Sequence, residues 1–301
     1  MESATRTGRF WDKASRPTAG FLQWGQVPLV KREIAKRYTG VPFTNHAEAD
    51  LHFMRAHCGG VSFERAISIG CGLARKELWL LQSGAVKHFD LFDLSGARVA
   101  AVATKLEEFG LQGRASVMMG DGLELAGNNL YDLVFWNSSL HHMYPVREAI
   151  GWSRDVLVPG GVFYFREYTG GNRIQYSATQ LAIANAVRGL LPDRLFEHPL
   201  DKGKTIPRTV ASISVEKIIE ADPTEARDSE SILPEFVRHF PGGKVVDLGG
   251  VVWFVALRNL YQNFNRSPED AELLRQLLKL DAVLADLGVS LMSVGCGTKL
   301  Q

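Results

Sequence analysis

The chain has 301 residues, of which 34 are Lys or Arg and 33 are Asp or Glu, so its net charge is +1 with neutral histidines. Hydrophobic residues make up 46% and charged residues 22%, values typical of a globular protein that exclude a disordered, collagen-like or coiled-coil chain. This near-neutral balance gives no basis for binding nucleic acid or a membrane surface through bulk charge, so we expect neither as a partner.

The three cysteines, Cys58, Cys71 and Cys296, include no CxxC pair. We therefore expect a reducing compartment, and neither a disulfide framework nor a structural zinc site. Residues 1–17 lack the apolar stretch of a signal peptide. The longest uninterrupted apolar run is only Val251 to Leu257, whereas a membrane helix needs about 20 residues. These features predict a cytoplasmic protein.

Short apolar runs alternate with helical patterns through the middle of the chain. Residues 1–61 are mixed and are expected to lie as helices and loops over a core. The predicted strands are 65–70, 87–95, 115–121, 131–137 and 161–167. Pro159-Gly160-Gly161 is expected to end the helix before the fifth strand. This alternation predicts a parallel sheet with helices on both faces, in a doubly wound α/β fold.

The chain after the fifth strand loses this alternation. Residues 167–235 hold one clear helical pattern, 177–190, and form an insertion suited to covering a ligand. A helix should begin at Ser267-Pro268 and end at Gly288, before a last strand over 289–294. Residues 250–264 fit a strand or a buried helix, and we favour the helix. The expected parts are thus a lid (1–61), a core (62–166), the insertion (167–235) and the rest of the core (236–301).

The segment ISIGCGLARKE, residues 67–77, carries the most chemistry. A strand enters Gly70-Cys71-Gly72 and a helix starts near Arg75. Glycines let the backbone turn tightly beside a ligand, and the helix N-terminus adds unpaired N–H groups. The loop alone is a weak signal, because Arg75 replaces the third glycine of a GxGxxG dinucleotide motif. Glu77 either faces a ligand or is an acid favoured by the helix dipole.

Polar residues also follow the next three strands. Asp93 ends the second strand, where a carboxylate can accept both hydrogen bonds of a ribose diol. Asp121, between Gly120 and Gly122, either accepts from an adenine amine or caps a short helix. Asn137 ends the fourth strand and precedes the pair His141-His142.

Together these residues resemble a class I S-adenosylmethionine (SAM)-dependent methyltransferase over residues 62–166. Residues 24–40, 166–176 and 222–234 are further similar to a bacterial branch whose acceptors are mostly unassigned. The resemblance implies a three-layer Rossmann-like sandwich around a seven-stranded mixed sheet with an antiparallel last strand. It also implies SAM as cofactor and S-adenosylhomocysteine as product. The cofactor-binding residues it implies are Gly70, Cys71, Gly72, Asp93, Leu94, Asp121, Gly122 and Asn137.

Two positions depart from the usual loop of these enzymes. Ser68 stands where an acid is usual, and Ala74 stands where a third loop glycine is usual. Serine can still accept a hydrogen bond, and Ala74 fits if its φ is negative. Neither change removes the expected ribose and adenine contacts.

The expected reaction is methyl transfer to a small-molecule or glycan acceptor, preferentially at a hydroxyl oxygen. His142, His141 and Glu167 are the candidate bases, because a hydroxyl must lose its proton and an imidazole titrates near neutral pH. A metal site of these three residues is disfavoured, because adjacent histidines on a regular helix or strand do not face one ion. The alternatives are a non-catalytic SAM-binding module, an RNA, protein or N-methyltransferase, and an NAD-dependent oxidoreductase. A homodimer stays open.

Overall fold

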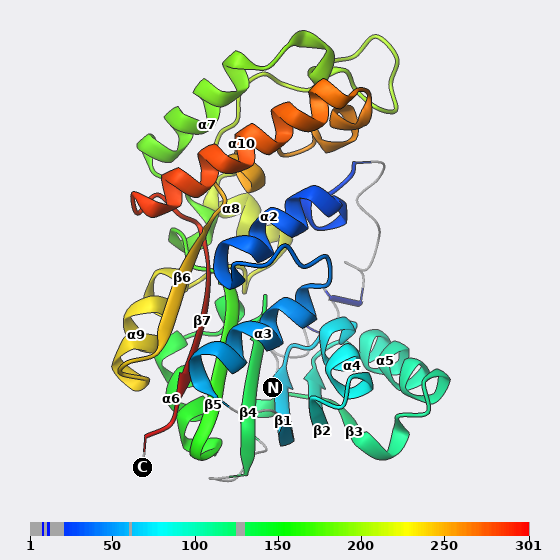
Figure 1. Cartoon of the computed structure of the whole chain (residues 1–301), viewed down its shortest axis with the longest axis vertical. Coiled ribbons are helices and arrows are strands. Elements are labelled where there is room, and N and C mark those ends of the chain that lie inside the picture. Colours follow the sequence, from blue (N-terminus) through cyan, green and yellow to red (C-terminus); the bar gives the residue numbers. More distant parts are fainter. Residues whose placement is uncertain (1–7, 9–10, 13–20, 60–61, 125–129, 301) are drawn as a thin grey trace.

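The computed structural model describes residues 8, 11–12, 21–59, 62–124 and 130–300 (Figure 1). Its centre is a seven-stranded sheet in the order β3-β2-β1-β4-β5-β7-β6. The strands are β1 (Phe63–Ile69), β2 (Val86–Asp93), β3 (Ala115–Met119), β4 (Tyr131–Asn137), β5 (Leu157–Tyr168), β6 (Lys244–Gly249) and β7 (Met292–Thr298). β7 runs antiparallel to both of its neighbours, and the other pairs are parallel. The predicted mixed sheet with an antiparallel last strand is confirmed.

Helices cover both faces of the sheet, because successive strand residues point to opposite sides. Ala66, Leu133 and Tyr164 belong to one apolar cluster, with α3 (His46–Cys58), α4 (Arg75–Gln82) and α5 (Gly96–Glu108). Ile67, Val134 and Phe165 belong to the other, with α6 (Val146–Val156) and α9 (Ile232–His239). These central strands are buried on both faces, which explains their nearly continuous apolar sequence.

A helical cap extends beyond the end of the sheet where β5 leads into the insertion (Figure 1). The helices of this cap are α2 (Pro28–Thr39), α7 (Ala178–Leu190), α8 (Val215–Ala221), the π-helix η8 (Val251–Ala256) and α10 (Pro268–Asp286). The cap thus contains helices from the N-terminal segment (1–61), the insertion (167–235) and the C-terminal segment (236–301). The C-terminal segment 236–301 is divided, because β6 and β7 complete the sheet whereas η8 and α10 lie in the cap.

Short 3₁₀ turns connect these elements. They are η1 (Trp24–Gln26), η2 (Gln112–Arg114), η3 (Gly122–Glu124), η4 (Leu140–His142), η5 (Asn172–Ile174), η6 (Asp193–Phe196), η7 (Ser229–Ser231) and η9 (Tyr261–Asn265). One of them, η4, follows β4 directly and carries both candidate histidines.

Several predicted boundaries differ from the structure. The helix favoured over 250–264 is confirmed as helical, but as η8 followed by η9. The last strand begins at Met292 rather than residue 289. The helix α6 ends at Val156, before Pro159, so residues 157–161 already belong to β5. The strand β6 and the helices α8 and α9 were not predicted individually.

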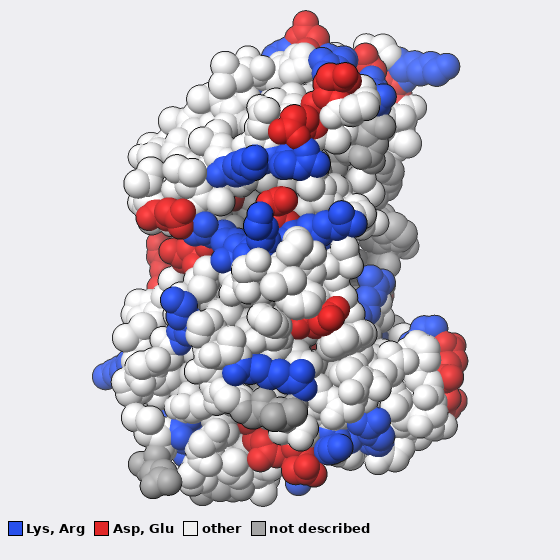
Figure 2. All heavy atoms as spheres, viewed as in Figure 1, with Lys and Arg blue, Asp and Glu red and all other residues white. Residues whose placement is uncertain are grey.

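The surface carries mixed charge. Figure 2 shows basic side chains gathered over α2 in the middle of one face, with acidic side chains beside them. In the part of the chain that the structure describes, no helix is both long and apolar enough to cross a bilayer.

Candidate functional site

The glycine loop after β1 adopts a conformation that requires its glycines. Gly70 and Gly72 have φ angles of 65° and 59°, in the left-handed region that glycine adopts without a steric penalty. A Cβ on Gly70 would lie 2.9 Å from the Cβ of Ser139. The loop after β1 therefore lies directly against the loop after β4, which carries the histidine pair.

Ala74 does not fit the expectation of a negative φ. It has φ 48° and ψ 33° and stands at the N-cap of α4. An L-residue in this left-handed conformation costs roughly 1–2 kcal/mol relative to the right-handed helix. In the turn into α4, Ala74 thus adopts the left-handed conformation that a glycine would favour.

A cavity of about 640 Å³ opens on this loop. Its lining comprises residues 71–77, Lys31, Asn45, His46, Ala47, Arg98 and Asn137. The structure therefore brings the predicted residues Cys71, Gly72 and Asn137 together, and adds a wall from the N-terminal helices. Gly122 has a packing role instead, because a Cβ there would lie 2.2 Å from the Cδ1 of Ile69.

Asp93 joins the end of β2 to the glycine loop. Its Oδ2 accepts a 2.8 Å hydrogen bond from the backbone N–H of Gly72, and its Oδ1 accepts one of 2.8 Å from that of Ser95. The side chain is almost fully buried, and burial raises the pKa of this carboxyl. The next residue, Leu94, is half-buried. Asp93 is not among the residues that line the cavity, and its contact with a ribose stays a prediction.

Glu77 supplies an acid close to the place where Ser68 lacks one. The Ser68 hydroxyl donates a 2.8 Å hydrogen bond to Glu77 Oε1. Glu77 lines the cavity although it is only 1% exposed, and burial raises the pKa of its carboxyl. An acid from the first turn of α4 thus reaches the end of β1. The sequence alone does not show this contact, because Glu77 lies nine residues after Ser68.

Asp121 shows the geometry of a capping residue. Its Oδ1 accepts a 3.0 Å hydrogen bond from the backbone N–H of Leu123, at the start of η3. A carboxylate has two oxygens, and this bond occupies one of them. The adenine contact of Asp121 stays a prediction.

A buried cluster of charges, which the sequence did not predict, lies behind the cavity. Asp50 on α3 is fully buried and pairs with Lys76 Nζ at 2.6 Å. It also accepts from the Tyr38 hydroxyl at 2.7 Å and lies 3.8 Å from Arg166 Nη1. Burial favours the neutral acid, but Lys76 and Arg166 outweigh it and lower the pKa of Asp50. Burial also lowers the pKa of Lys76 to about 8.

His46, on the cavity wall, is held neutral by this environment. Its Nε2 lies 3.0 Å from the carbonyl oxygen of Lys31, to which the ring donates. Burial, with the nearby charges of Arg166 and Lys76, lowers the pKa of His46 to about 3. The unfolded chain therefore binds a proton between about pH 6.5 and pH 3 that the folded chain does not, so this group favours unfolding as the pH falls.

We expect His46→Gln to reduce the loss of stability in acid. Between pH 7 and pH 5 the wild-type protein should lose on the order of 1–2 kcal/mol more of its free energy of unfolding than the variant. Urea denaturation of both proteins at the two pH values measures this difference. Parallel losses in the two proteins would contradict the buried neutral state of His46.

Glu167 orients His141. Its Oε2 lies 2.5 Å from His141 Nδ1, and its Oε1 accepts from the backbone N–H groups of Ser139 at 2.8 Å and Leu140 at 3.0 Å. Because Glu167 is fully buried and these donors surround it, it serves to position the imidazole rather than to contact an acceptor. Burial disfavours the imidazolium, but the charges of Glu167 and Glu225 outweigh it and raise the pKa of His141.

His142 has a defined tautomer. Its Nδ1 lies 3.1 Å from Thr224 Oγ1, and the Thr224 hydroxyl donates its own hydrogen to Asp222 Oδ1 at 2.7 Å. The Thr224 oxygen can therefore only accept, so Nδ1 carries the hydrogen and Nε2 carries the lone pair. Burial lowers the pKa of His142 well below its usual range, which keeps the ring neutral.

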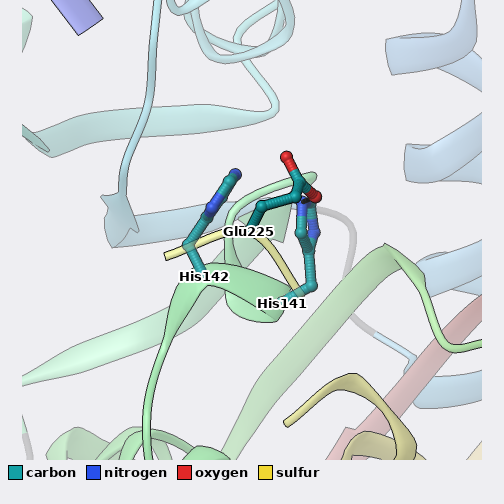
Figure 3. Close-up of side chains that lie close together, drawn as sticks. All are labelled: His141, His142 and Glu225. Carbon is teal, nitrogen blue, oxygen red and sulfur yellow. Dashed lines mark ion pairs between the residues drawn. The ribbon is translucent and has the colours of Figure 1, made fainter. Parts of the chain in front are cut away.

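Glu225 is a site residue that the candidate set missed. Its Oε1 lies 3.5 Å from His141 Nε2, and Figure 3 shows the carboxylate beside both imidazoles. Its position in the segment 222–234, which resembles the bacterial branch, is the one signal in the sequence. Because Glu225 is 84 residues after His141 in the chain, only the folded insertion reveals the contact.

Two residues of the N-terminal segment reach both halves of the site. The Trp11 ring lies 4.4 Å from the Arg98 guanidinium and meets His142 edge-on at 5.3 Å. Asp12 accepts from the Ser95 hydroxyl at 2.6 Å, at the start of α5. These contacts support the expected lid role of the N-terminal residues that the structure describes.

A second cavity of about 210 Å³, here called the aromatic cavity, lies where residues 22–24, residues 174–218 of the insertion and residues 253–261 meet. Its aromatic lining is Trp24, Tyr176, Trp253, Phe254 and Tyr261, with Arg258 beside them. Burial raises the pKa of the Tyr176 hydroxyl, Arg258 lowers it and the charge of Glu225 raises it further. Ile174 also lines this cavity, and the preceding residue, Arg173, donates from Nη1 to the Glu225 carbonyl oxygen at 3.1 Å. The cavity therefore lies near the Glu225 side of the site.

Comparisons with known proteins agree with this geometry. Residues 67–165, which carry the glycine loop, Asp93 and both histidines, match the family described as "Methyltransferase domain". The chain has the Rossmann-like methyltransferase fold. No curated protein sequence matches the chain.

Solved structures with this methyltransferase fold resemble the whole chain at low identity. A geranyl diphosphate C-methyltransferase from Streptomyces coelicolor, in complex with Mg²⁺, geranyl-S-thiolodiphosphate and S-adenosylhomocysteine, has a TM-score of 0.56 at 11% identity over 100% of this chain and 99% of that one. A Haemonchus contortus phosphoethanolamine N-methyltransferase 2 has a TM-score of 0.55 at 13% identity over 98% and 60%. The [4+2]-cyclase SpnF has a TM-score of 0.52 at 16% identity over 99% and 97%.

Proposed function

We propose that the protein transfers a methyl group from SAM to a hydroxyl oxygen of a small-molecule acceptor. The observation that carries this proposal is the 640 Å³ cavity built on the Gly70–Gly72 loop with Asp93 beside it. The match of residues 67–165 to a methyltransferase domain supports it. The S-adenosylhomocysteine in the Streptomyces structure supports SAM as the cofactor.

Polar groups on the cavity lining, and two carboxylates outside it at the ends of neighbouring strands, suit the different parts of SAM. Asp93 can accept from both ribose hydroxyls, and Asp121 from the adenine amine. The buried acid Glu77 suits the ammonium group of the methionine part. The cations Lys31, Lys76 and Arg98 on the cavity lining suit its carboxylate.

The acceptor is proposed to lie between the histidine pair and the aromatic cavity. Five aromatic side chains line that cavity, together with the aliphatic side chains of Leu22, Ile174, Ile213 and Ile218 and the polar groups of Gln23, Arg258 and Asn259. The apolar part of this lining suits an acceptor with an apolar ring or chain. An acceptor that extends from this cavity would carry its hydroxyl to the side of Glu225 and the histidines.

In this reaction the main task of the protein is to align the acceptor oxygen with the methyl group of SAM. The acceptor oxygen bonds to the methyl carbon as the sulfur–carbon bond breaks, and the hydroxyl proton is lost to the histidine pair or Glu225. Gly70 and Gly72, which lack a Cβ, would leave room for a cofactor beside the loop backbone, and Trp11 packs edge-on against His142. Holding the two reactants in line and excluding water supplies much of the rate enhancement.

Calorimetric titration tests the cofactor. We expect the purified protein to bind SAM and S-adenosylhomocysteine with micromolar dissociation constants, and to show no binding of NADH. Tight NADH binding would instead favour an oxidoreductase. Failure of both SAM compounds to bind, with or without a panel of apolar alcohols, would reject the proposal.

Transfer needs a second measurement, because a protein of this fold is named as a cyclase. Protein, SAM labelled on the methyl group and a panel of apolar alcohols, amines and sugars should give labelled product with the alcohols. Label in the amines alone would replace the oxygen acceptor with nitrogen. SAM binding without transfer to any member of the panel would favour a non-catalytic module.

A further inference from the structure

We propose that His141, His142 and Glu225 form a binding site for a divalent transition-metal ion. Among the described residues, these three side chains have one ligand atom each within 4.8 Å of one another. They come from two segments, the 3₁₀ turn η4 and the insertion. Figure 3 shows both imidazoles and the carboxylate directed toward the same space.

The structure removes the reason for expecting no metal site. That expectation assumed that the adjacent histidines lie on a regular helix or strand, where consecutive side chains diverge. They lie instead in the single turn η4, and their ring centroids are 4.2 Å apart with the planes inclined by 38°. The two rings are therefore side by side, and the third ligand is Glu225 rather than Glu167.

Hydrogen bonds at Nδ1 orient both rings in the way that is usual for metal-ligating imidazoles. A ligating histidine commonly donates its other ring N–H to a carboxylate or another oxygen, which fixes its tautomer. His141 has Glu167 Oε2 at 2.5 Å from Nδ1, and His142 has Thr224 Oγ1 at 3.1 Å from Nδ1. His142 thus keeps Nε2 and its lone pair for another partner, and His141 offers its Nε2 lone pair once the proton on that atom has left.

The local charge balance favours a cation. Three carboxylates, those of Glu167, Glu225 and Asp222, surround the two rings. Asp222 is only 5% exposed, its Oδ2 has no hydrogen-bond partner among the described residues, and it lies 3.7 Å from His142 Nδ1. His141 Nε2 and Glu225 Oε1 face each other at 3.5 Å, so a proton or a metal ion must separate the two lone pairs.

The donor set selects the kind of ion. Two imidazoles and one carboxylate suit Zn²⁺, Fe²⁺, Co²⁺ or Mn²⁺ better than Mg²⁺, which prefers oxygen ligands. Ligand atoms lie about 2.0–2.2 Å from such an ion, so two ligand atoms of a tetrahedral site are about 3.4 Å apart. Those of this cluster, which lie within 4.8 Å of one another, must therefore approach by about 1 Å. Glu225 is half-buried and can move by side-chain rotation. Three protein ligands leave positions for water or an acceptor oxygen.

Metal binding by this cluster does not depend on methyl transfer, but its use in the reaction rests on the proposed function. An ion there would polarise the acceptor hydroxyl and ease the loss of its proton. In that case the histidines would act as ligands, and the acceptor proton would leave to solvent.

The test uses the full chain without a purification tag, after a chelator has removed bound metal. One sample is titrated with Co²⁺ and followed by visible absorption, and a second is titrated with Zn²⁺ and followed by calorimetry. We expect one equivalent of each ion to bind, with an intensified Co²⁺ band. His142→Ala and Glu225→Gln should each weaken binding at least tenfold. His52→Ala, which removes an exposed imidazole on α3, is the matched control and should bind as the wild type does.

SAM titration of the same proteins separates this proposal from the proposed function. Glu225→Gln conserves the side-chain volume, so its SAM affinity and melting temperature should stay close to the wild-type values. Wild-type protein that binds SAM but neither ion would overturn the metal site and leave a proton shared by His141 and Glu225. Equal metal affinity in wild type and Glu225→Gln would overturn it as well.

Discussion

Asp93→Ala is expected to lower the affinity for SAM by about 100-fold or more. A hydrogen bond to a charged group is worth about 1.5–3 kcal/mol, and the carboxylate is proposed to accept from two ribose hydroxyls. Two such bonds correspond to about 3 kcal/mol at least, or roughly two orders of magnitude in the dissociation constant. The substitution also releases the Gly72 N–H, so the loop loses a contact that orders it. Calorimetry with SAM measures the change.

Asp132→Ala is the matched control for this prediction. Asp132 Oδ2 likewise accepts two backbone hydrogen bonds, from Glu64 at 3.0 Å and Arg65 at 2.9 Å, but near the start of β1 and β4 rather than at the cavity. This variant should lose stability and keep its SAM affinity. Near-wild-type affinity in Asp93→Ala would remove Asp93 from the site, and an equal loss in both variants would indicate a general effect on folding.

The sheet core could be read from the sequence because its strands are buried on both faces. Residues 131–137 are almost wholly apolar and coincide with β4. The edge strand β6 is only partly buried over 244–247 and gave no such run. β7 contains Gly295 and Gly297, residues that usually argue against a strand. Gly295 is required there, since a Cβ would lie 2.2 Å from the Phe165 ring.

The cofactor half of the site was more predictable than the acceptor half. Gly72, Asp93 and Asn137 follow consecutive strands or the loop between strand and helix, so the topology alone brings them to one edge of the sheet. Glu225 and Asp50 reach the site from the insertion and the N-terminal helices. Their contacts with His141 and Lys76 join residues far apart in the chain, which no local pattern encodes.

The division between the two halves of the site matters for function, because the matched domain and the segments outside it line different cavities. Residues 67–165 match a methyltransferase domain, whereas the aromatic cavity is lined entirely by residues outside that range. Solved structures with the same fold are named as a C-methyltransferase, an N-methyltransferase and a cyclase. Proteins of one fold thus carry different activities, and we propose that the cap determines the acceptor in this chain.

Asp50→Ala is expected to be the most destabilising of the substitutions considered, by about 3–5 kcal/mol in the free energy of unfolding. Asp50 is fully buried and is the carboxylate that Lys76 and Arg166 share. Its removal leaves the buried Arg166 and the partly exposed Lys76 without their partner, and the Tyr38 hydroxyl loses its acceptor. Urea denaturation at neutral pH measures the loss.

The double variant Asp50→Ala/Lys76→Met separates the unpaired charge from the lost volume. If the cost comes from burying Lys76 without a carboxylate, the second substitution should recover a substantial part of the lost stability, since an apolar chain of similar length needs no partner. Additive losses would show instead that packing around α3 and α4 dominates. Lys76 also lines the cofactor cavity, so the double variant should recover stability and still bind SAM more weakly than the wild type does. That outcome would place one residue, Lys76, in both the buried charge cluster and the cofactor site.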